Sequence, residues 1–394
     1  MRIYLDYAAT APLDREAEKA MQPYLAEKFG NASSLHAYGQ EAVAALDRSR
    51  ATVASALGAD FREVVFTGSA TEANNLALRG VVKKAYSKHG LRKPRIVVSA
   101  VEHESVIETA RDLAREDEVE LVILPVDSAG LVDPLSVKPY LNRETALISV
   151  MYANNEVGTI QPIKEIGRLV REFREKGSVY PLLHTDAVQA FQYLSCRTSE
   201  LEVDLMTISS HKIYGPKGAG ALYFRAQSAG LDPIITGGGQ EFGMRSGTEN
   251  IPGVVGLANA VAKTERLRIR EAERVEKLRD YFYRRLSGEL DISLNGPSLD
   301  SGARLPNNLN LCFPGQLAES LLVAFASSGL AVSTGSACQS RATTPSHVVL
   351  AMSGDRSRAL SSLRLTLGRN STKKEIDTAA ETIIKIIKKR QRSS

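Results

Sequence analysis

Short apolar runs that alternate with helical patterns, from about residue 60 to residue 225, limit most strongly what this chain can fold into. The runs are rich in β-branched residues and read VVFT, RIVVSA, ELVILPV, ALISVMY, PLLHTD, DLMTISS and GALYF. Helical patterns lie between several of them, at 70 to 87, 104 to 115 and 163 to 176. Strands that alternate with helices form largely parallel sheets covered on both faces. The alternation therefore predicts an α/β domain.

The pattern changes near residue 255. A long, charged, amphipathic helical pattern covers 256 to 286, and separate strands (DISLNG, NLNLCF) and helices (318 to 328, 373 to 389) follow it. A chain of 394 residues is long enough for about two domains. We therefore expect a large α/β domain over 15–254 and a smaller α+β domain made of 1–14 and 255–394.

Composition excludes several classes of protein. The chain is 43% hydrophobic but has no apolar run long enough to cross a membrane, and its start, MRIYLDYAATAPLD, does not resemble a secretory signal. Its three cysteines form neither a disulfide framework nor paired zinc-ligand spacing. We expect a cytoplasmic protein with no metal site and no membrane contact.

The net charge of +5 is concentrated in the helical stretch 263 to 285 and in the tail KIIKKRQRSS. Such runs are usually solvated helix faces, so nucleic-acid binding is not expected. An acidic protein or RNA partner stays open as an alternative that rests on the tail.

The most informative motif is DLMTISSHKIYGPKGAG, in which a β-like run ends at Ser209, Ser210, His211 and Lys212 before a glycine-rich turn. Pyridoxal 5'-phosphate (PLP) chemistry needs a lysine amine at such a crevice, both to bind the cofactor and to move protons at the substrate α-carbon. The neighbouring hydroxyl and imidazole groups suit a phosphate. The alternative is a solvated surface lysine.

Asp186 ends another strand-like run and is followed by Gln189. A carboxylate at this place can hold a pyridine nitrogen protonated, which makes the ring an electron sink. The alternative is an aspartate that only caps the next helix.

A helix start with Ser-x-x-Glu spacing follows VVFT, at Ser69 to Glu72, and includes Ala70 and Thr71. Its backbone N–H groups and the Thr71 hydroxyl suit a phosphate, although a cap can be structural only. His103 follows RIVVSA and could stack on a flat ring and shuttle protons, or be an ordinary core histidine. Asn154, in an Asn-Asn pair, could contact the ring or a substrate carboxylate, or simply form a turn.

Taken together, these motifs resemble one known family over nearly the whole chain. The segments, in order, are LDYAATAPL, TGSATEANNLAL, VEHESV, YANNEVGTIQPI, HTDAVQ, SSHKIYGPKGAGALY, GGGQEFGMRSGTENIPGVVGLA and GSACQSRATTPSHVVLAM. They resemble the cysteine desulfurases of the NifS/IscS family, which are related to class V aminotransferases. The resemblance implies a PLP-dependent transferase of fold type I with a mostly parallel seven-stranded sheet in the large domain. It also implies a homodimer with active sites near the subunit interface.

The resemblance implies a role for each candidate residue. Lys212 is similar to the lysine that binds PLP as a Schiff base, Asp186 to the partner of the pyridine nitrogen, and His103 to the stacking acid/base. Arg364 resembles the arginine that grips the substrate carboxylate, which suits a guanidinium. The remaining cofactor positions are Gln189 at the ring hydroxyl, Asn154 at cofactor and substrate, Ala70, Thr71, Ser209 and His211 at the phosphate, and Thr248 at the phosphate of the opposite subunit.

Cys338, between small and polar neighbours in GSACQSRA, resembles the sulfur-handling cysteine. The resemblance implies that its thiolate attacks the sulfur of PLP-bound L-cysteine, which leaves a persulfide on Cys338 and yields L-alanine. A free thiol has a pKa of about 8.5, so the site has to supply thiolate. Cys312, in an apolar run, and Cys196 are expected to be structural.

The sulfur acceptor is left open by the sequence. The stretch after Cys338 has the length typical of the NifS/IscS branch, which suits direct transfer to an acceptor protein, either a scaffold or a thiolation enzyme. Iron–sulfur cluster assembly, tRNA or cofactor thiolation and DNA phosphorothioation all fit. The C-terminus lacks the aromatic-rich ending of housekeeping relatives, and Phe242 stands where many relatives carry a basic residue.

Two other functions are compatible with the motifs. One is a PLP lyase or aminotransferase that acts on another amino acid, such as selenocysteine. The other is a non-catalytic scaffold that keeps the fold and binds partners.

Overall fold

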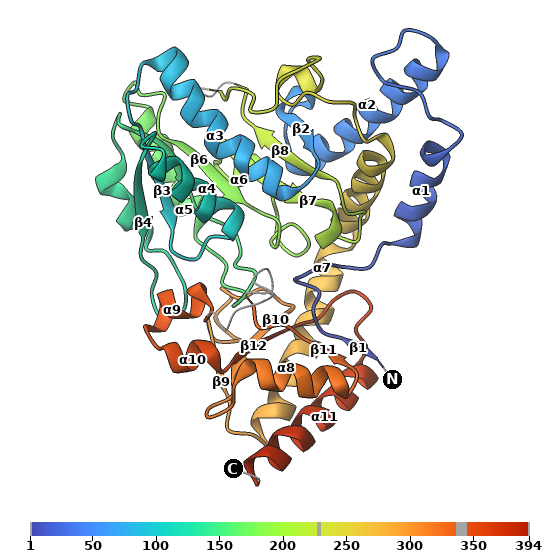
Figure 1. Cartoon of the computed structure of the whole chain (residues 1–394), viewed down its shortest axis with the longest axis vertical. Coiled ribbons are helices and arrows are strands. Elements are labelled where there is room, and N and C mark those ends of the chain that lie inside the picture. The colour runs from blue at the N-terminus through green and yellow to red at the C-terminus, as the bar shows by residue number, and fades with distance from the viewer. Residues whose placement is uncertain (1, 227–229, 336–344, 393–394) are drawn as a thin grey trace.

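The chain, described by a computed structural model for residues 2–226, 230–335 and 345–392, has two parts of different architecture. A large part surrounds a central sheet, and a smaller part lies below it (Figure 1). The chain begins in the smaller part, builds the large part, and returns through the long helix α7 (Ile251–Ser287).

The central sheet has seven strands in the order β2-β8-β7-β6-β5-β3-β4. Their bounds are β2 (Val64–Thr67), β8 (Gly220–Phe224), β7 (Leu205–Ser209), β6 (Leu182–Asp186), β5 (Thr145–Ser149), β3 (Arg95–Ser99) and β4 (Glu120–Leu124). Strand β8 is antiparallel to β2 and β7, and the other pairs are parallel. All seven predicted runs are strands, and the predicted fold class is confirmed.

Both faces of this sheet are buried, which explains why its strands read as continuous apolar runs. Val64 and Phe66 point into one core, while Val65 between them points into another, as the period of two in a strand requires. The first core also contains residues of α2 (Ala37–Leu57), α5 (Ile163–Arg174) and the first turns of α7. The second contains residues of α3 (Ala70–His89) and α4 (Glu104–Arg115), which lie over the same face (Figure 1).

Shorter helices complete the large part. They are α1 (Arg15–Leu25), α6 (Thr198–Leu201) and the 3₁₀ turns η1 (Phe61–Glu63), η2 (Pro134–Tyr140), η3 (Ser210–Lys212) and η4 (Glu241–Gly243). Helix α1 packs on α7, as does α2.

The smaller part has a core of its own, formed by helices on a short antiparallel sheet. The sheet has the order β12-β10-β9, with β12 (Ser362–Thr366), β10 (Asn308–Cys312) and β9 (Ser293–Leu294), and a parallel pair joins β1 (Ile3–Tyr4) to β11 (Leu330–Ala331). The helices are α8 (Ala318–Ser327), α9 (His347–Ser353), α10 (Arg356–Leu360) and α11 (Lys373–Gln391).

Helix α7 connects the two parts without a break. Its first half packs in a core of the large part through Val254 and Leu257, and its second half packs in the small core through Val275 and Phe282. The residues 1–14 also contribute Ile3 and Leu5 to the small core. The division into 15–254 and 1–14 with 255–394 stays a prediction, and its boundary falls inside this continuous helix.

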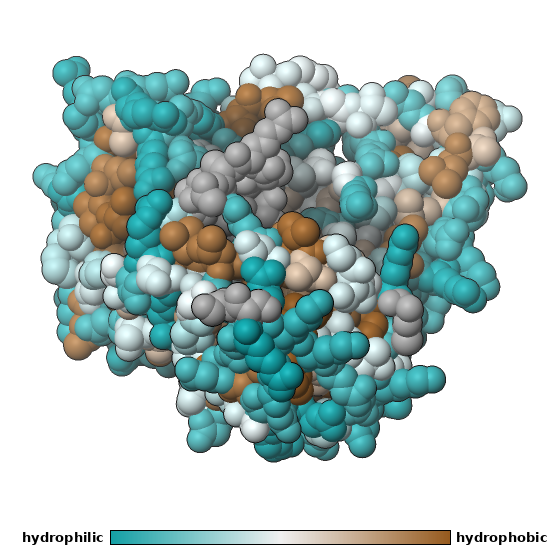
Figure 2. Space-filling model, turned by 60° about the horizontal axis from the view of Figure 1, so that its bottom comes forward, coloured by the Kyte–Doolittle hydropathy of each residue, from teal (hydrophilic) through white to brown (hydrophobic). Residues whose placement is uncertain are grey.

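The surface at the lower end is mainly hydrophilic, with separate hydrophobic patches between polar groups (Figure 2). Within the described ranges, none of the helices combines the length and apolar character needed to span a bilayer.

Candidate active site

A cavity of about 590 Å³ lies at the edge of the central sheet where the parallel strands end. Strands β2, β3, β5, β6 and β7 all point their carboxyl ends to this edge, so the segments that follow them converge there. Of the predicted site residues, those that line the cavity are Ala70, Thr71, His103, Asp186, Gln189, Ser209, His211, Lys212 and Arg364. A second cavity, of about 540 Å³, lies between α7 and the start of α11, and none of the predicted residues lines it.

Lys212 lies in the 3₁₀ turn η3, directly after strand β7. Its Nζ donates hydrogen bonds to the backbone carbonyls of Ala8 and Ala9, at 2.7 and 2.6 Å. Gln189 donates to the same carbonyl of Ala8 at 2.9 Å, so the N-terminal segment covers both side chains. The lysine amine is thereby held at the cavity wall.

Asp186 is the last residue of β6, and its carboxylate is almost fully buried beside the cavity. Asn74 Nδ2 donates to Oδ2 at 2.8 Å, and the backbone N–H of Val188 donates to Oδ1 at 3.0 Å. These donors hold the carboxylate in one orientation. A protonated pyridine nitrogen is a further donor that such an anion can accept.

His103 is the N-cap of α4, and the residue two positions later fixes its ring. Its Nδ1 accepts a hydrogen bond from the backbone N–H of Ser105 at 3.1 Å and lies 2.8 Å from the Ser105 hydroxyl. In the neutral ring the proton is then on Nε2, the nitrogen suited to exchange protons in the cavity.

The start of α3 supplies a place for an anion. Ser69 caps the helix through its hydroxyl, which accepts from the backbone N–H of Glu72, as the spacing predicted. The Glu72 carboxylate accepts from the N–H of Gly68, at 2.9 Å, and not from the N–H of the N-cap residue Ser69. Ala70 and Thr71, in the first turn, line the cavity, where orphan N–H groups favour a phosphate.

His211 lies beside this helix start. Burial, together with the charges of Lys212 and Lys217, lowers the pKa of His211 to about 4. The imidazole is therefore neutral at physiological pH, and its Nδ1 lies 3.1 Å from the Thr10 hydroxyl. A neutral histidine can donate one hydrogen bond to a phosphate without adding charge.

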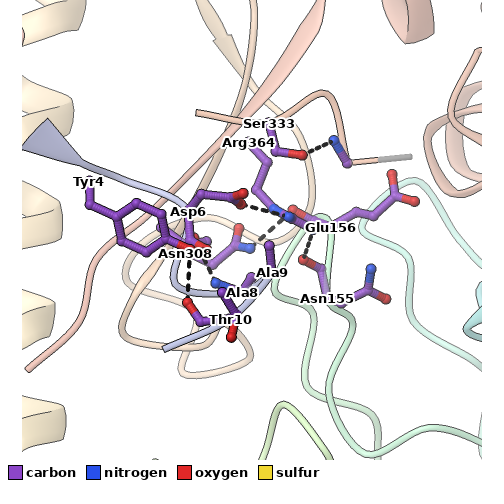
Figure 3. Close-up of polar contacts among 12 residues, drawn as sticks. Tyr4, Asp6, Ala8, Ala9, Thr10, Asn155, Glu156, Asn308, Ser333 and Arg364 are labelled. Atoms are coloured by element: carbon purple, nitrogen blue, oxygen red, sulfur yellow. Dashed lines mark hydrogen bonds and ion pairs between the residues drawn. The ribbon is translucent and has the colours of Figure 1, made fainter. Parts of the chain in front are cut away.

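Arg364, in the middle of β12, brings the small part of the molecule to the cavity. Its Nη2 donates to Asp6 Oδ1 at 2.8 Å and its Nη1 to the backbone carbonyl of Asn155 at 3.0 Å (Figure 3). The guanidinium is almost fully buried, with 3% of the side chain exposed. A buried guanidinium at a cavity wall suits a carboxylate ligand.

Taken together, these groups fit PLP. The cavity combines an amine, a buried carboxylate, a helix start with hydroxyl neighbours and a guanidinium, which match in turn the aldehyde, the ring nitrogen, the phosphate and a substrate carboxylate.

Two predicted residues, Asn154 and Thr248, do not line the cavity. Asn154 is fully buried, and both ends of its amide have protein partners: Oδ1 accepts from the N–H groups of Glu156 and Val157 in its own turn, and Nδ2 donates to the distant carbonyl of Val101. It does not line the cavity, whereas Asn155 does. Thr248 is exposed and outside the cavity. Cys338 lies outside the described residues.

The other two cysteines, expected to be structural, are both buried. Burial raises the pKa of the Cys196 thiol well above its usual range and also raises that of Cys312. Both thiols are therefore protonated at neutral pH, which fits a structural role.

Residue-by-residue reasoning missed several contacts of this site. Asn74 hydrogen-bonds to Asp186, and Ser105 hydrogen-bonds to His103. Asn74 and Ser105 lie inside helices, where no residue spacing marks them as contacts of the site. The carbonyls of Ala8 and Ala9 belong to the backbone, so their side chains carry no signal. Only the family motif LDYAATAPL pointed to that segment.

Comparison with known proteins supports the same interpretation. Residues 3–378 match the family model Aminotransferase class-V. A cysteine desulfurase IscS from Dictyoglomus turgidum is 43% identical over 388 residues, which is 98% of this chain and 95% of that protein. A solved structure named NifS-like protein has a TM-score of 0.89 at 34% identity and covers 98% of this chain and 100% of its own. A structure of SspA in complex with cysteine has a TM-score of 0.78 at 31% identity, over 93% of this chain and 99% of that one.

These matches confirm the predicted family, fold and cofactor. Because they extend over nearly the whole length on both sides, the chain belongs to the PLP-dependent class V aminotransferase family and, within it, to the cysteine desulfurases of the NifS/IscS kind.

Proposed function

We propose that this chain is a PLP-dependent cysteine desulfurase that converts L-cysteine to L-alanine and carries the sulfur as a persulfide on Cys338. The observation that carries the proposal is the convergence on one cavity of Lys212 from the turn after β7, Asp186 from the end of β6 and Arg364 from β12. The full-length similarity to proteins named cysteine desulfurase supports the substrate, as does the neighbour solved with cysteine.

The residues divide the work between holding the cofactor and handling the substrate. Lys212 would bind PLP covalently, Asp186 would hold its ring nitrogen protonated, and the start of α3 with Ser209 and His211 would hold its phosphate. Bound PLP withdraws electrons from the substrate α-carbon. Gln189, which lines the cavity, stays a proposal as a further cofactor contact, whereas Asn154 does not line it.

Substrate binding and proton transfer fall to side chains on the cavity wall. Arg364 would bind the α-carboxylate of cysteine, and the amino group of the substrate would then face Lys212. Lys212 takes and returns protons at the α-carbon, and His103 is placed to act as a second acid/base.

Sulfur transfer requires a thiolate at Cys338. The thiolate forms an S–S bond to the substrate sulfur while the substrate C–S bond breaks. The electron pair of the broken C–S bond stays on the β-carbon of the substrate. A proton taken up by this carbon completes alanine. An acceptor protein then removes the sulfur from the persulfide.

Two features of the environment belong to the same proposal. The protein would be a cytoplasmic homodimer in which Thr248, exposed in this chain, contacts the phosphate in the opposite subunit. The acceptor would be a scaffold or thiolation enzyme, and it can be identified by following labelled sulfur from the persulfide.

The decisive experiment compares Cys338→Ala with Cys312→Ala, which removes a buried thiol instead. We expect Cys338→Ala to retain the absorbance of bound PLP but to form no persulfide and no alanine from cysteine. Cys312→Ala should keep both products. Undiminished alanine formation by Cys338→Ala would contradict the mechanism, and activity on selenocysteine alone would favour a lyase.

A further inference from the structure

We propose that Asp6 is an internal counter-ion that limits how tightly Arg364 binds the carboxylate of substrate and product. The inference rests on the proposed role of Arg364 and adds a residue that sets affinity.

The first observation is the contact itself. Arg364 Nη2 donates to Asp6 Oδ1 at 2.8 Å, and the arginine and aspartate side chains are 3% and 18% exposed (Figure 3). A charge pair this far from solvent is weakly screened, so each partner changes the affinity of the other for further ions.

The second observation concerns the hydrogen-bonding capacity that Arg364 has left. Nη1 is used by the carbonyl of Asn155 and Nη2 by Asp6, while Nε is buried and has no partner within the described part of the chain. A guanidinium carries five N–H groups, so donors remain for a ligand. Arg364 lines the cavity and Asp6 does not. A ligand carboxylate therefore meets the guanidinium without displacing Asp6.

The third observation is that Asp6 is fixed in place. The Tyr4 hydroxyl donates to the backbone carbonyls of Asp6 and Thr10, each at 2.9 Å. Asp6 also forms a parallel bridge to Thr366, two residues from Arg364 on the same strand. The backbone of Asp6 is therefore held beside β12, which keeps its carboxylate next to the guanidinium.

These observations together predict how the pair acts. When a substrate carboxylate binds, two anions share one cation, and their repulsion lowers affinity. Substrate and product both carry an α-carboxylate, so weaker binding also speeds the release of alanine. Asp6 thus lowers the affinity for bound substrate and product and thereby favours turnover.

The test measures binding rather than catalysis, with two ligands that differ only in charge. L-alanine carries the α-carboxylate, and L-alaninamide replaces it with a neutral amide. Their dissociation constants are read from the change in absorbance of the PLP-loaded protein. Asp6→Asn keeps an oxygen that accepts from Arg364 and removes the charge.

We expect Asp6→Asn to bind L-alanine about tenfold more tightly, or roughly 1.4 kcal/mol, and L-alaninamide as the unmodified protein does. Glu120→Gln removes an exposed carboxylate on β4, paired with Arg95, and should change neither constant. If Asp6→Asn does not fold, Asp6→Ser removes the same charge and carries the same expectation.

Unchanged or weaker alanine binding by these Asp6 variants would overturn the inference. Arg364→Gln separates this result from a failure of the proposed function. If Arg364→Gln binds alanine poorly, only the role of Asp6 is wrong. If it binds alanine as tightly as the unmodified protein, Arg364 is not the carboxylate site and both proposals fail.

Discussion

Glu102 is a carboxyl group in an environment that disfavours its charge. It is fully buried beside His103, and its Oε1 accepts from the Ser99 hydroxyl at 2.5 Å and from the Met151 N–H at 2.8 Å. Its Oε2 has no partner in the described part of the chain. Burial, and to a lesser extent the charge of Asp186, raises the pKa of Glu102 to about 8.

The pH dependence of stability follows from this shift. The folded-state pKa of Glu102 is above its unfolded value, so its contribution is complete below about pH 4.5 and is lost as the pH rises through about 8. Glu102→Gln keeps the shape and removes the titration. Its melting temperature, relative to that of the unmodified protein, should therefore rise between pH 5 and pH 9. Glu108→Gln, exposed on α4, should show no such trend, and a flat difference for Glu102→Gln would contradict the prediction.

Lys212 and Lys217 both line the cavity, which allows a matched comparison. Because only Lys212 follows strand β7 directly and lies against the carbonyls of Ala8 and Ala9, it should be the covalent anchor. Lys212→Ala should lose PLP on dialysis, and Lys217→Ala should retain it, as measured by absorbance. Retention of PLP by Lys212→Ala after denaturation would show that another amine binds it.

At the scale of elements, η4 is clamped by a buried ion pair. Arg50 donates from Nη1 and Nη2 to the two carboxylate oxygens of Glu241, at 2.6 and 2.7 Å, and the N–H of Phe66 donates to the same carboxylate. The ring of Phe242, half exposed, lies 4.8 Å from the Arg50 guanidinium. A basic side chain at position 242 would face the Arg50 cation, whereas the Phe242 ring packs against it.

Removing one partner of this pair should be costly, since a buried charge is left uncompensated. We expect Glu241→Gln to lower the free energy of unfolding by about 3–5 kcal/mol, as measured by denaturant unfolding. Glu116→Gln, whose carboxylate is 55% exposed near Arg79, should change it by less than about 1 kcal/mol. A loss below about 1 kcal/mol for Glu241→Gln would show that the clamp does not stabilise the fold.

The elements that the sequence predicts well are those whose packing is local. Helices expected at 104 to 115 and 318 to 328 are found at Glu104–Arg115 and Ala318–Ser327, because an apolar stripe specifies each of them and the His103 side chain caps the first. The two-residue strands β1 and β11 are too short for any alternation, whereas β9 lies within the predicted run DISLNG. The antiparallel direction of β8 depends on its neighbours in space, which its residues do not encode.

At the scale of the whole molecule, the N-terminal segment joins the small core to the cavity. Leu5 is buried in the small core, Asp6 pairs with Arg364, and the carbonyls of Ala8 and Ala9 accept from Lys212. Each of these contacts bridges distant parts of the sequence. The residue pattern therefore pointed to Lys212 and the family resemblance to Arg364, but residue types alone could not place the two on one wall.

This connection predicts that a change in the small core reaches the cavity. Leu5→Ala should lower the free energy of unfolding by about 2–5 kcal/mol, as large-to-small changes in a core do. Leu321→Ala, equally buried in the same core but on α8, should cost a similar amount. Only Leu5→Ala should also change the KM for cysteine, because Leu5 positions the segment that holds Asp6 beside Arg364 and covers Lys212. Equal KM values in the two variants would mean that the cavity is built by the large part alone, and that the N-terminal segment merely lies over it.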